Sequence, residues 1–100
     1  MNMKKLYVLV RKDLGVSQQA VQAGHAVAEW VLKLGGWMDW TNGILVYLGV
    51  ESERELERWI YKLGRRDIEF VGFKEPDIGN QYTALAILGN GKLFSRLELL

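Results

Sequence analysis

Apolar and polar positions follow two different rhythms along this chain. Four short runs of apolar, β-prone residues predict strands at residues 6–10, 44–48, 68–73 and 83–88. The first run, Leu6 to Val10, reads LYVLV with no polar interruption, which is typical of a strand covered on both faces. Between the runs, apolar residues recur at helical spacing, so helices are expected there.

The first helical segment begins near Ser17, a favourable N-cap residue, and ends at Gly35-Gly36, a helix stop signal. We expect its apolar side to pack on the sheet, with small residues that permit a close approach. The expected apolar side comprises Ala20, Ala23, Gly24, Val27, Val31 and Leu34. The opposite, polar side comprises Gln18, Gln22, His25, Glu29 and Lys33.

A second helix is predicted by the capping box of Ser52 and Glu55, and it ends at Gly64. Its apolar stripe comprises Leu56, Trp59, Ile60 and Leu63. The order of elements is therefore β-α-β-α-β-β. This order predicts one α/β domain over residues 1–100, with helices packed on a four-stranded mixed sheet. The short link between the last two strands allows them to pair antiparallel.

The composition is that of a folded, soluble chain, with 49% hydrophobic residues, four tryptophans and no cysteine. No apolar run is long enough to cross a membrane, so we expect a cytoplasmic protein. The formal net charge of +1 argues against broad coating of nucleic acid, although a local basic patch remains possible. The basic positions that could form one are Lys4, Lys5, Arg11 and Lys12 near the first strand, and Arg65-Arg66 further along.

His25, the only histidine, is the first candidate for chemistry. It could act as a general base or a hydrogen-bond donor, supported by Gln22 one turn away, or it could be a structural residue that joins helix and sheet. No metal is expected, because one histidine without cysteine is a poor ligand set. Asp77 and Thr83 form the second candidate. They could orient a water and steady an oxyanion, or Asp77 could only satisfy backbone amides in an Asx turn.

Two further groups have open interpretations. Arg11, Lys12 and Asp13 follow the first strand and could hold a phosphate or a carboxylate, or they could form a solvated turn with an internal Asp–Arg pair. The loop with Trp37, Met38 and Trp40 contains side chains that could stack on a base. We favour the view that this loop packs on the core or forms a subunit contact.

Four motifs in the same order resemble the class II peptidyl-tRNA hydrolase family. YVLVRKDL resembles its first strand and R-x-D-L exit, and AVQAGHA (Ala20 to Ala26) resembles its A-x-Q-x-x-H-A helix motif. EPDIGNQYTALAI resembles its acidic turn and threonine-led strand, and the closing LELL resembles its common L-K-L-L ending. The resemblance spans essentially the whole chain.

The resemblance implies a compact α/β domain, often a homodimer, that cleaves the ester between a peptide and the ribose of tRNA without a cofactor. It implies that Asp77 orients the water and that Thr83 contacts the oxyanion or the ribose. Gln22 and His25 would support them. The acceptor end of peptidyl-tRNA would be held by Arg11, Lys12, Asp13 and Gln18.

Gln18 stands where this family carries a lysine, and the loop before it is shorter. Two hypotheses follow. In the first, the chain is a hydrolase in which Lys12 supplies the missing positive charge near the oxyanion. In the second, the chain is a non-catalytic relative that binds a protein partner, RNA or a second copy of itself.

Overall fold

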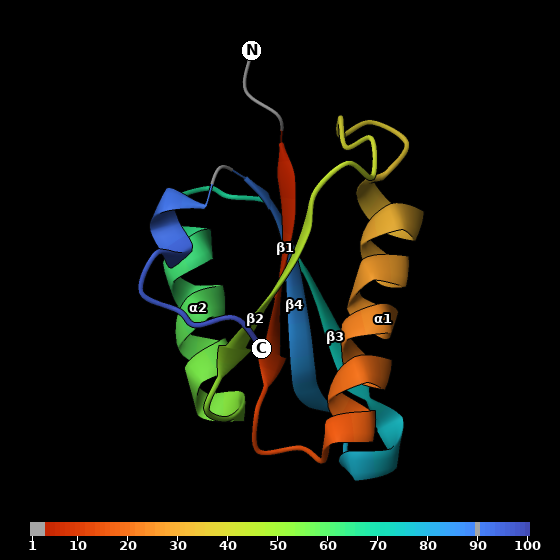
Figure 1. Cartoon of the computed structure of the whole chain (residues 1–100), viewed down its shortest axis with the longest axis vertical. Helices are drawn as coiled ribbons and strands as arrows, with labels where there is room; N and C mark the ends of the chain where they lie inside the picture. Colours follow the sequence, from red (N-terminus) through yellow and green to blue (C-terminus); the bar gives the residue numbers. More distant parts are fainter. Residues whose placement is uncertain (1–3, 90) are drawn as a thin grey trace.

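The chain folds into three layers, with a sheet between two helices (Figure 1). The computed structural model describes residues 4–89 and 91–100. The elements are β1 (Lys5–Arg11), α1 (Val16–Leu34), β2 (Leu45–Val50), α2 (Glu53–Arg65), β3 (Val71–Glu75), η1 (Pro76–Ile78), β4 (Gln81–Gly89) and η2 (Lys92–Phe94). The β-α-β-α-β-β order is thus confirmed, with two short 3-10 helices added.

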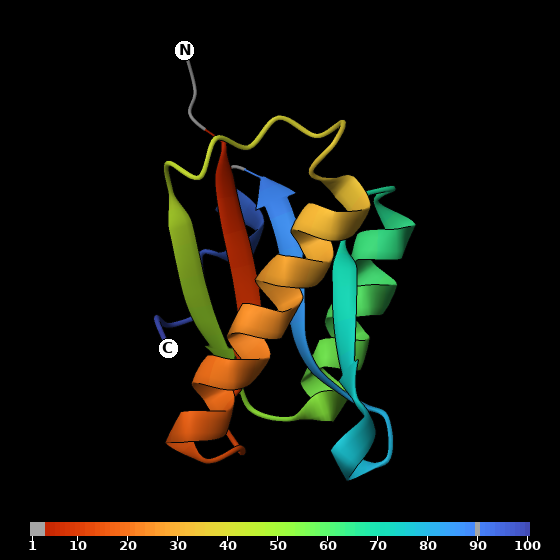
Figure 2. The ribbon, with the colours of Figure 1, turned by 90° about the vertical axis from the view of Figure 1, so that its right-hand side faces the viewer.

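The four strands lie in the order β2-β1-β4-β3, as Figure 2 shows. β1 pairs parallel to β2, because the α1 crossover returns the chain to the same end of the sheet. β4 pairs antiparallel to both β1 and β3. The short η1 link therefore closes a β3–β4 hairpin, and the predicted mixed sheet with an antiparallel last pair is confirmed.

Side chains of the two central strands alternate between two cores. Val8 and Val10 pack with Ala84 under α1, whereas Leu9 and Leu85 pack under α2. All five are fully buried. Alternation of period two on a sheet covered by helices on both faces explains why Leu6 to Val10 contains no polar residue.

The rotation of α1 differs from the prediction. Its buried residues are Gln22, Ala23, Ala26, Trp30 and Leu34. Ala20 and Gly24 are exposed instead, and Val31 is 47% exposed. The periodicity misled because the outward side of α1 is also rich in apolar residues, including Leu32, which is 80% exposed. In the observed rotation of α1, the side chain of Gln22 faces the interior of the protein.

The boundaries of both α-helices also differ from the predicted ones. α1 begins at Val16 with Gly15 as its N-cap, so Ser17 is not the cap. Ser52 is the N-cap of α2 as predicted, but the Glu55 carboxylate accepts a hydrogen bond from the backbone N–H of Glu51 at 2.8 Å rather than from that of Ser52. α2 continues through Gly64 to Arg65.

The tryptophan-containing loop packs largely as expected. The indole N–H of Trp40 donates to the carbonyl of Ile44 at 3.0 Å, and its ring meets Trp30 edge-on. Met38 packs on the same core. Trp37 differs, because 72% of it is exposed.

The last residues of the chain cover the outer edge of β2. The N–H of Gly49 donates to the carbonyl of Glu98 at 2.9 Å, and the N–H of Leu100 donates to the carbonyl of Tyr47 at 3.0 Å. These bonds occupy backbone groups that an edge strand otherwise leaves unpaired. Among the described residues, no helix combines the length and apolar character needed to cross a membrane.

Candidate active site

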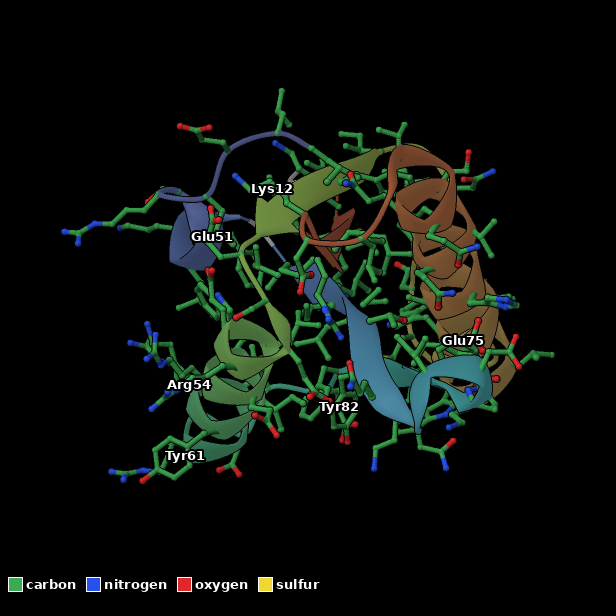
Figure 3. All side chains as sticks on the ribbon, turned by 90° about the horizontal axis from the view of Figure 1, so that it is seen from below. Lys12, Glu51, Arg54, Tyr61, Glu75 and Tyr82 are labelled. Atoms are coloured by element: carbon green, nitrogen blue, oxygen red, sulfur yellow. The ribbon has the colours of Figure 1, made fainter. Side chains whose placement is uncertain are left out.

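A pocket with mixed polar and apolar walls lies between the first half of α1 and the turn that joins β3 to β4. Its volume is about 440 Å³. It is lined by Leu14, Gln18, Val21, Gln22, His25, Glu75, Asp77 and Ile78. The pocket therefore brings together Gln18, Gln22, His25 and Asp77, which sequence reasoning had selected from two distant segments. Figure 3 shows Glu75 beside α1 at this end of the sheet.

A chain of hydrogen bonds connects the core to the pocket. The hydroxyl of Thr83 donates to Oε1 of Gln22 at 2.7 Å, and Nε2 of Gln22 donates to Oε1 of Glu75 at 2.8 Å. Nε2 also donates to Oε1 of Gln18 at 3.2 Å. Gln22 is 1% exposed and Thr83 is 0% exposed. Buried and fully bonded, the Gln22 amide fixes the orientation of the Glu75 carboxylate.

This geometry changes the role expected of Thr83. Its hydroxyl faces Gln22 inside the protein and does not line the pocket. It therefore positions Gln22 rather than contacting an oxyanion or a ribose.

His25 lies on the pocket side of α1 and stacks on Phe73 of β3. The ring centroids are 4.4 Å apart and the rings are nearly parallel, at 8°. The stack joins helix and sheet, as a structural histidine would, yet the residue remains exposed at the pocket. Among the described residues, no hydrogen-bond partner occupies either ring nitrogen, so both nitrogens are free to meet a ligand.

Asp77 lies in η1, where Pro76 opens the turn and Gly79 closes it with φ of 72°. The backbone N–H of Asn80 donates to the carbonyl of Glu75 at 3.0 Å and so fixes the loop. The Asp77 carboxylate accepts no hydrogen bond from the described part of the chain, so the Asx-turn alternative is wrong. The carboxylate is exposed and lines the pocket.

Arg11 and Asp13 lie outside the pocket and bind each other. Nε and Nη2 of Arg11 donate to the two carboxylate oxygens of Asp13, both at 2.9 Å. Nη1 donates to Oε1 of Gln81 and to the carbonyl of Tyr82. The hydrogen bond between the two side chains lowers the pKa of Asp13 and raises the pKa of Arg11. We therefore assign this pair to the structure of the β1 exit rather than to substrate binding.

Lys12 also points elsewhere. Its Nζ lies 3.0 Å from Oε1 of Glu51, and this hydrogen bond raises the pKa of Lys12. Figure 3 shows these two residues side by side, on the opposite side of the view from Glu75. The hypothesis that Lys12 supplies the positive charge missing at Gln18 is therefore wrong for this arrangement.

Glu75 is the pocket residue that sequence reasoning missed. The strand was expected to end at Phe73, but β3 runs from Val71 to Glu75. Extending the alternation of Val71 and Phe73 by two residues would have placed Glu75 on the α1 face. The position of Glu75 in the pocket therefore follows from where β3 ends, and no sequence motif indicates it.

The pocket is acidic and otherwise neutral. Among its described lining residues, Glu75 and Asp77 carry charge and none is Lys or Arg. No group of three His, Asp or Glu side chains with the arrangement of a metal site occurs in the described part of the chain. The pocket thus offers carboxylates as proton acceptors, and the amide of Gln18 and the imidazole of His25 as hydrogen-bonding groups.

Comparison with known proteins identifies the fold alone. No protein-family profile matches the chain, and no curated protein matches its sequence. The chain is similar in structure to a protein of unknown function from Agrobacterium tumefaciens strain C58, with a TM-score of 0.72 and 16% sequence identity. The similarity covers 100% of this chain and 99% of that one.

Proposed function

We propose that the pocket hydrolyses the ester that joins a peptide to the terminal ribose of tRNA. The observation that carries this proposal is the shared pocket, in which Gln22 and His25 of α1 meet Glu75 and Asp77 of the β3–η1 turn. The resemblance of these segments to the class II peptidyl-tRNA hydrolases supports the choice of ester. We assign the activity to the cytoplasm, where translation supplies peptidyl-tRNA.

The proposed reaction needs only water and the side chains of the chain. Asp77, whose carboxylate is exposed, accepts a proton as a water oxygen forms a bond to the ester carbonyl carbon. Glu75, held by Gln22, fixes the position of that water. The bond from the carbonyl carbon to the ribose oxygen then breaks, and the proton passes from Asp77 to the ribose oxygen. The products are a ribose hydroxyl and a free peptide carboxylic acid, which becomes a carboxylate by releasing its proton to the solvent.

The developing oxyanion would be stabilised by hydrogen-bond donors that line the pocket. The side-chain amide of Gln18 and a ring N–H of His25 are the donors that line the pocket. One well-placed donor of this kind contributes about a hundredfold to a thousandfold in rate. Apolar contacts from Leu14, Val21 and Ile78 would hold the peptide side chain nearest the ester.

The test is release of an N-acetylated amino acid from tRNA by the purified protein, by Glu75→Gln and by Asp77→Asn. Glu57→Gln, an exposed change on α2, removes the same charge outside the pocket. We expect wild type and E57Q to release the amino acid, and E75Q and D77N to be slower by about a hundredfold. Equal rates for all four proteins, or no release by any, would overturn the proposal.

A second candidate is a non-catalytic binding protein. The observation that favours it is the lack of Lys or Arg among the described pocket-lining residues, since a positive charge stabilises an oxyanion better than a neutral donor does. Under this reading the pocket binds a ligand with hydrogen-bond donors, such as an amine or a peptide N-terminus. Absence of hydrolysis together with shifts of the His25 ring signals on titration with such an amine would support it.

A further inference from the structure

A groove lies on the other face of the sheet, between the second half of α2 and the segment that follows β4. Figure 1 shows η2 beside α2 at this place. The groove has a volume of about 630 Å³. It is lined by Trp59, Lys62, Arg66, Ile68, Lys92, Leu93, Ser95, Arg96 and Leu97. We call it the basic groove.

The basic groove concentrates positive charge. Its lining contains Lys62, Arg66, Lys92 and Arg96, and it contains no Asp or Glu. Across residues 4–89 and 91–100, Lys62, Arg66 and Arg96 make no salt bridge with a carboxylate. A net charge of +1 for the whole chain therefore conceals a strongly positive site.

Helix stability accounts for only half of this charge. Lys62 and Arg66 lie at the C-terminal end of α2, where cations are favoured by the helix dipole. Arg96 belongs to a different segment, and folding brings it to the same groove as Lys62 and Arg66 against like-charge repulsion. An anionic ligand would compensate for that repulsion.

Aromatic and apolar groups lie beside these charges. The ring of Trp59 packs against Phe94 at 5.1 Å, and Nζ of Lys62 lies 4.7 Å from the centroid of the indole. Ile68, Leu93 and Leu97 add apolar surface. The groove thus presents an indole, apolar side chains and cations together, which matches a ligand that repeats a charged group and a planar, partly apolar group.

We propose that the basic groove binds a single strand of nucleic acid through its phosphates. The cations come from two separate segments, the end of α2 and the segment after β4, so a ligand that carries several phosphates can contact both segments at once. An acidic peptide would satisfy the charges, whereas the bases of a nucleic acid would also cover the apolar surface of Ile68, Leu93 and Leu97 beside them. This inference does not depend on the hydrolase proposal, because it concerns another face of the sheet.

The experiment measures binding of a fluorescent single-stranded RNA of about ten nucleotides, at several salt concentrations. The test variant is Arg66→Gln/Arg96→Gln; both residues are exposed, so the fold should survive. The matched control is Lys33→Gln/Arg54→Gln, which removes the same charge outside the groove. Competitors are single-stranded DNA, ATP, inorganic phosphate and a polyglutamate peptide of similar length.

We expect R66Q/R96Q to bind RNA about tenfold or more weakly than the control, with a salt slope lower by about 1.4, because each phosphate contact on a single strand contributes about 0.7. The indole N–H signal of Trp59 should shift on binding. Single-stranded DNA should compete, whereas ATP and phosphate should compete weakly. Equal binding by the two double variants, or competition by polyglutamate or ATP as strong as that by RNA, would overturn the proposal.

Discussion

The two faces of this sheet present opposite chemistry. On the α1 face, the pocket holds the carboxylates of Glu75 and Asp77 among neutral groups. On the α2 face, the basic groove holds four cations beside an indole. The positive and negative charges of the whole chain nearly cancel, so its net charge of +1 indicates neither site. The contacts also differ, because Glu75 accepts a part-buried hydrogen bond from Gln22 whereas the groove cations lie at the surface.

The largest effect on stability is expected at the end of β1, at Arg11→Met. The substitution removes the donors to Asp13, Gln81 and the carbonyl of Tyr82 while it keeps the volume of the side chain. We expect the free energy of unfolding to fall by about 3 kcal/mol, measured by urea denaturation. Arg54→Met, at an exposed position, should change it by less than about 0.5 kcal/mol. Equal effects would show that the Arg11 contacts contribute little.

Thr83→Val tests whether buried hydrogen bonds hold the pocket in order. The variant keeps the shape but leaves Oε1 of Gln22 without its donor inside the protein. We expect a loss of about 1–2 kcal/mol in the free energy of unfolding and about a tenfold loss of hydrolysis. The exposed change Thr41→Val should affect neither. Loss of stability with full hydrolysis would mean that the Thr83–Gln22–Glu75 chain does not position the carboxylate.

A smaller, pH-dependent effect is expected from Asp13. The hydrogen bond from Arg11 lowers its pKa in the folded protein, so its contribution to stability is present above the unfolded pKa and is lost as the pH falls through the folded pKa. The stability difference between wild type and Asp13→Asn should therefore narrow below about pH 4. Because the side chain is 41% exposed, the difference should stay under about 1 kcal/mol. A difference that widens in acid would contradict the pairing.

The smallest effect is expected at Lys12→Ala. The side chain is exposed and pairs with Glu51, away from the pocket. Hydrolysis by this variant should stay within about twofold of wild type, and its melting temperature should be unchanged. A large loss of hydrolysis would restore Lys12 as the source of positive charge for the oxyanion.

The pattern of apolar and polar residues predicted the fold well, because within a strand or helix it reflects which side chains are buried. The unbroken run from Leu6 to Val10 predicted a strand covered on both faces, and the Arg11–Asp13 pair, two residues apart, was among the alternatives considered. The rotation of α1 was not predictable in the same way. The outward side of that helix contains several apolar residues, and Gln22 faces inward because it bonds to Glu75 and Thr83, which are distant in sequence.

The sites depended on the same distant contacts. Glu75 was missed because a strand boundary was placed two residues too early, and Thr83 received a surface role because its burial was not visible from its neighbours in sequence. Arg65-Arg66 indicated a basic point near the groove. The sequence pattern did not indicate that Lys92 and Arg96 would lie in the same groove, because their position depends on the path that the chain takes after β4.

The most direct test of the account is single-turnover hydrolysis of N-acetylated aminoacyl-tRNA with the protein in saturating excess, which separates chemistry from binding. Wild type, Glu75→Gln/Asp77→Asn and the matched surface variant Glu57→Gln/Glu69→Gln would be compared with spontaneous release. We expect wild type and the surface variant to exceed the spontaneous rate by about a hundredfold or more, whereas the pocket variant should not exceed it. A wild-type rate equal to the spontaneous one, or a pocket variant as fast as wild type, would overturn the proposed hydrolase activity of the pocket.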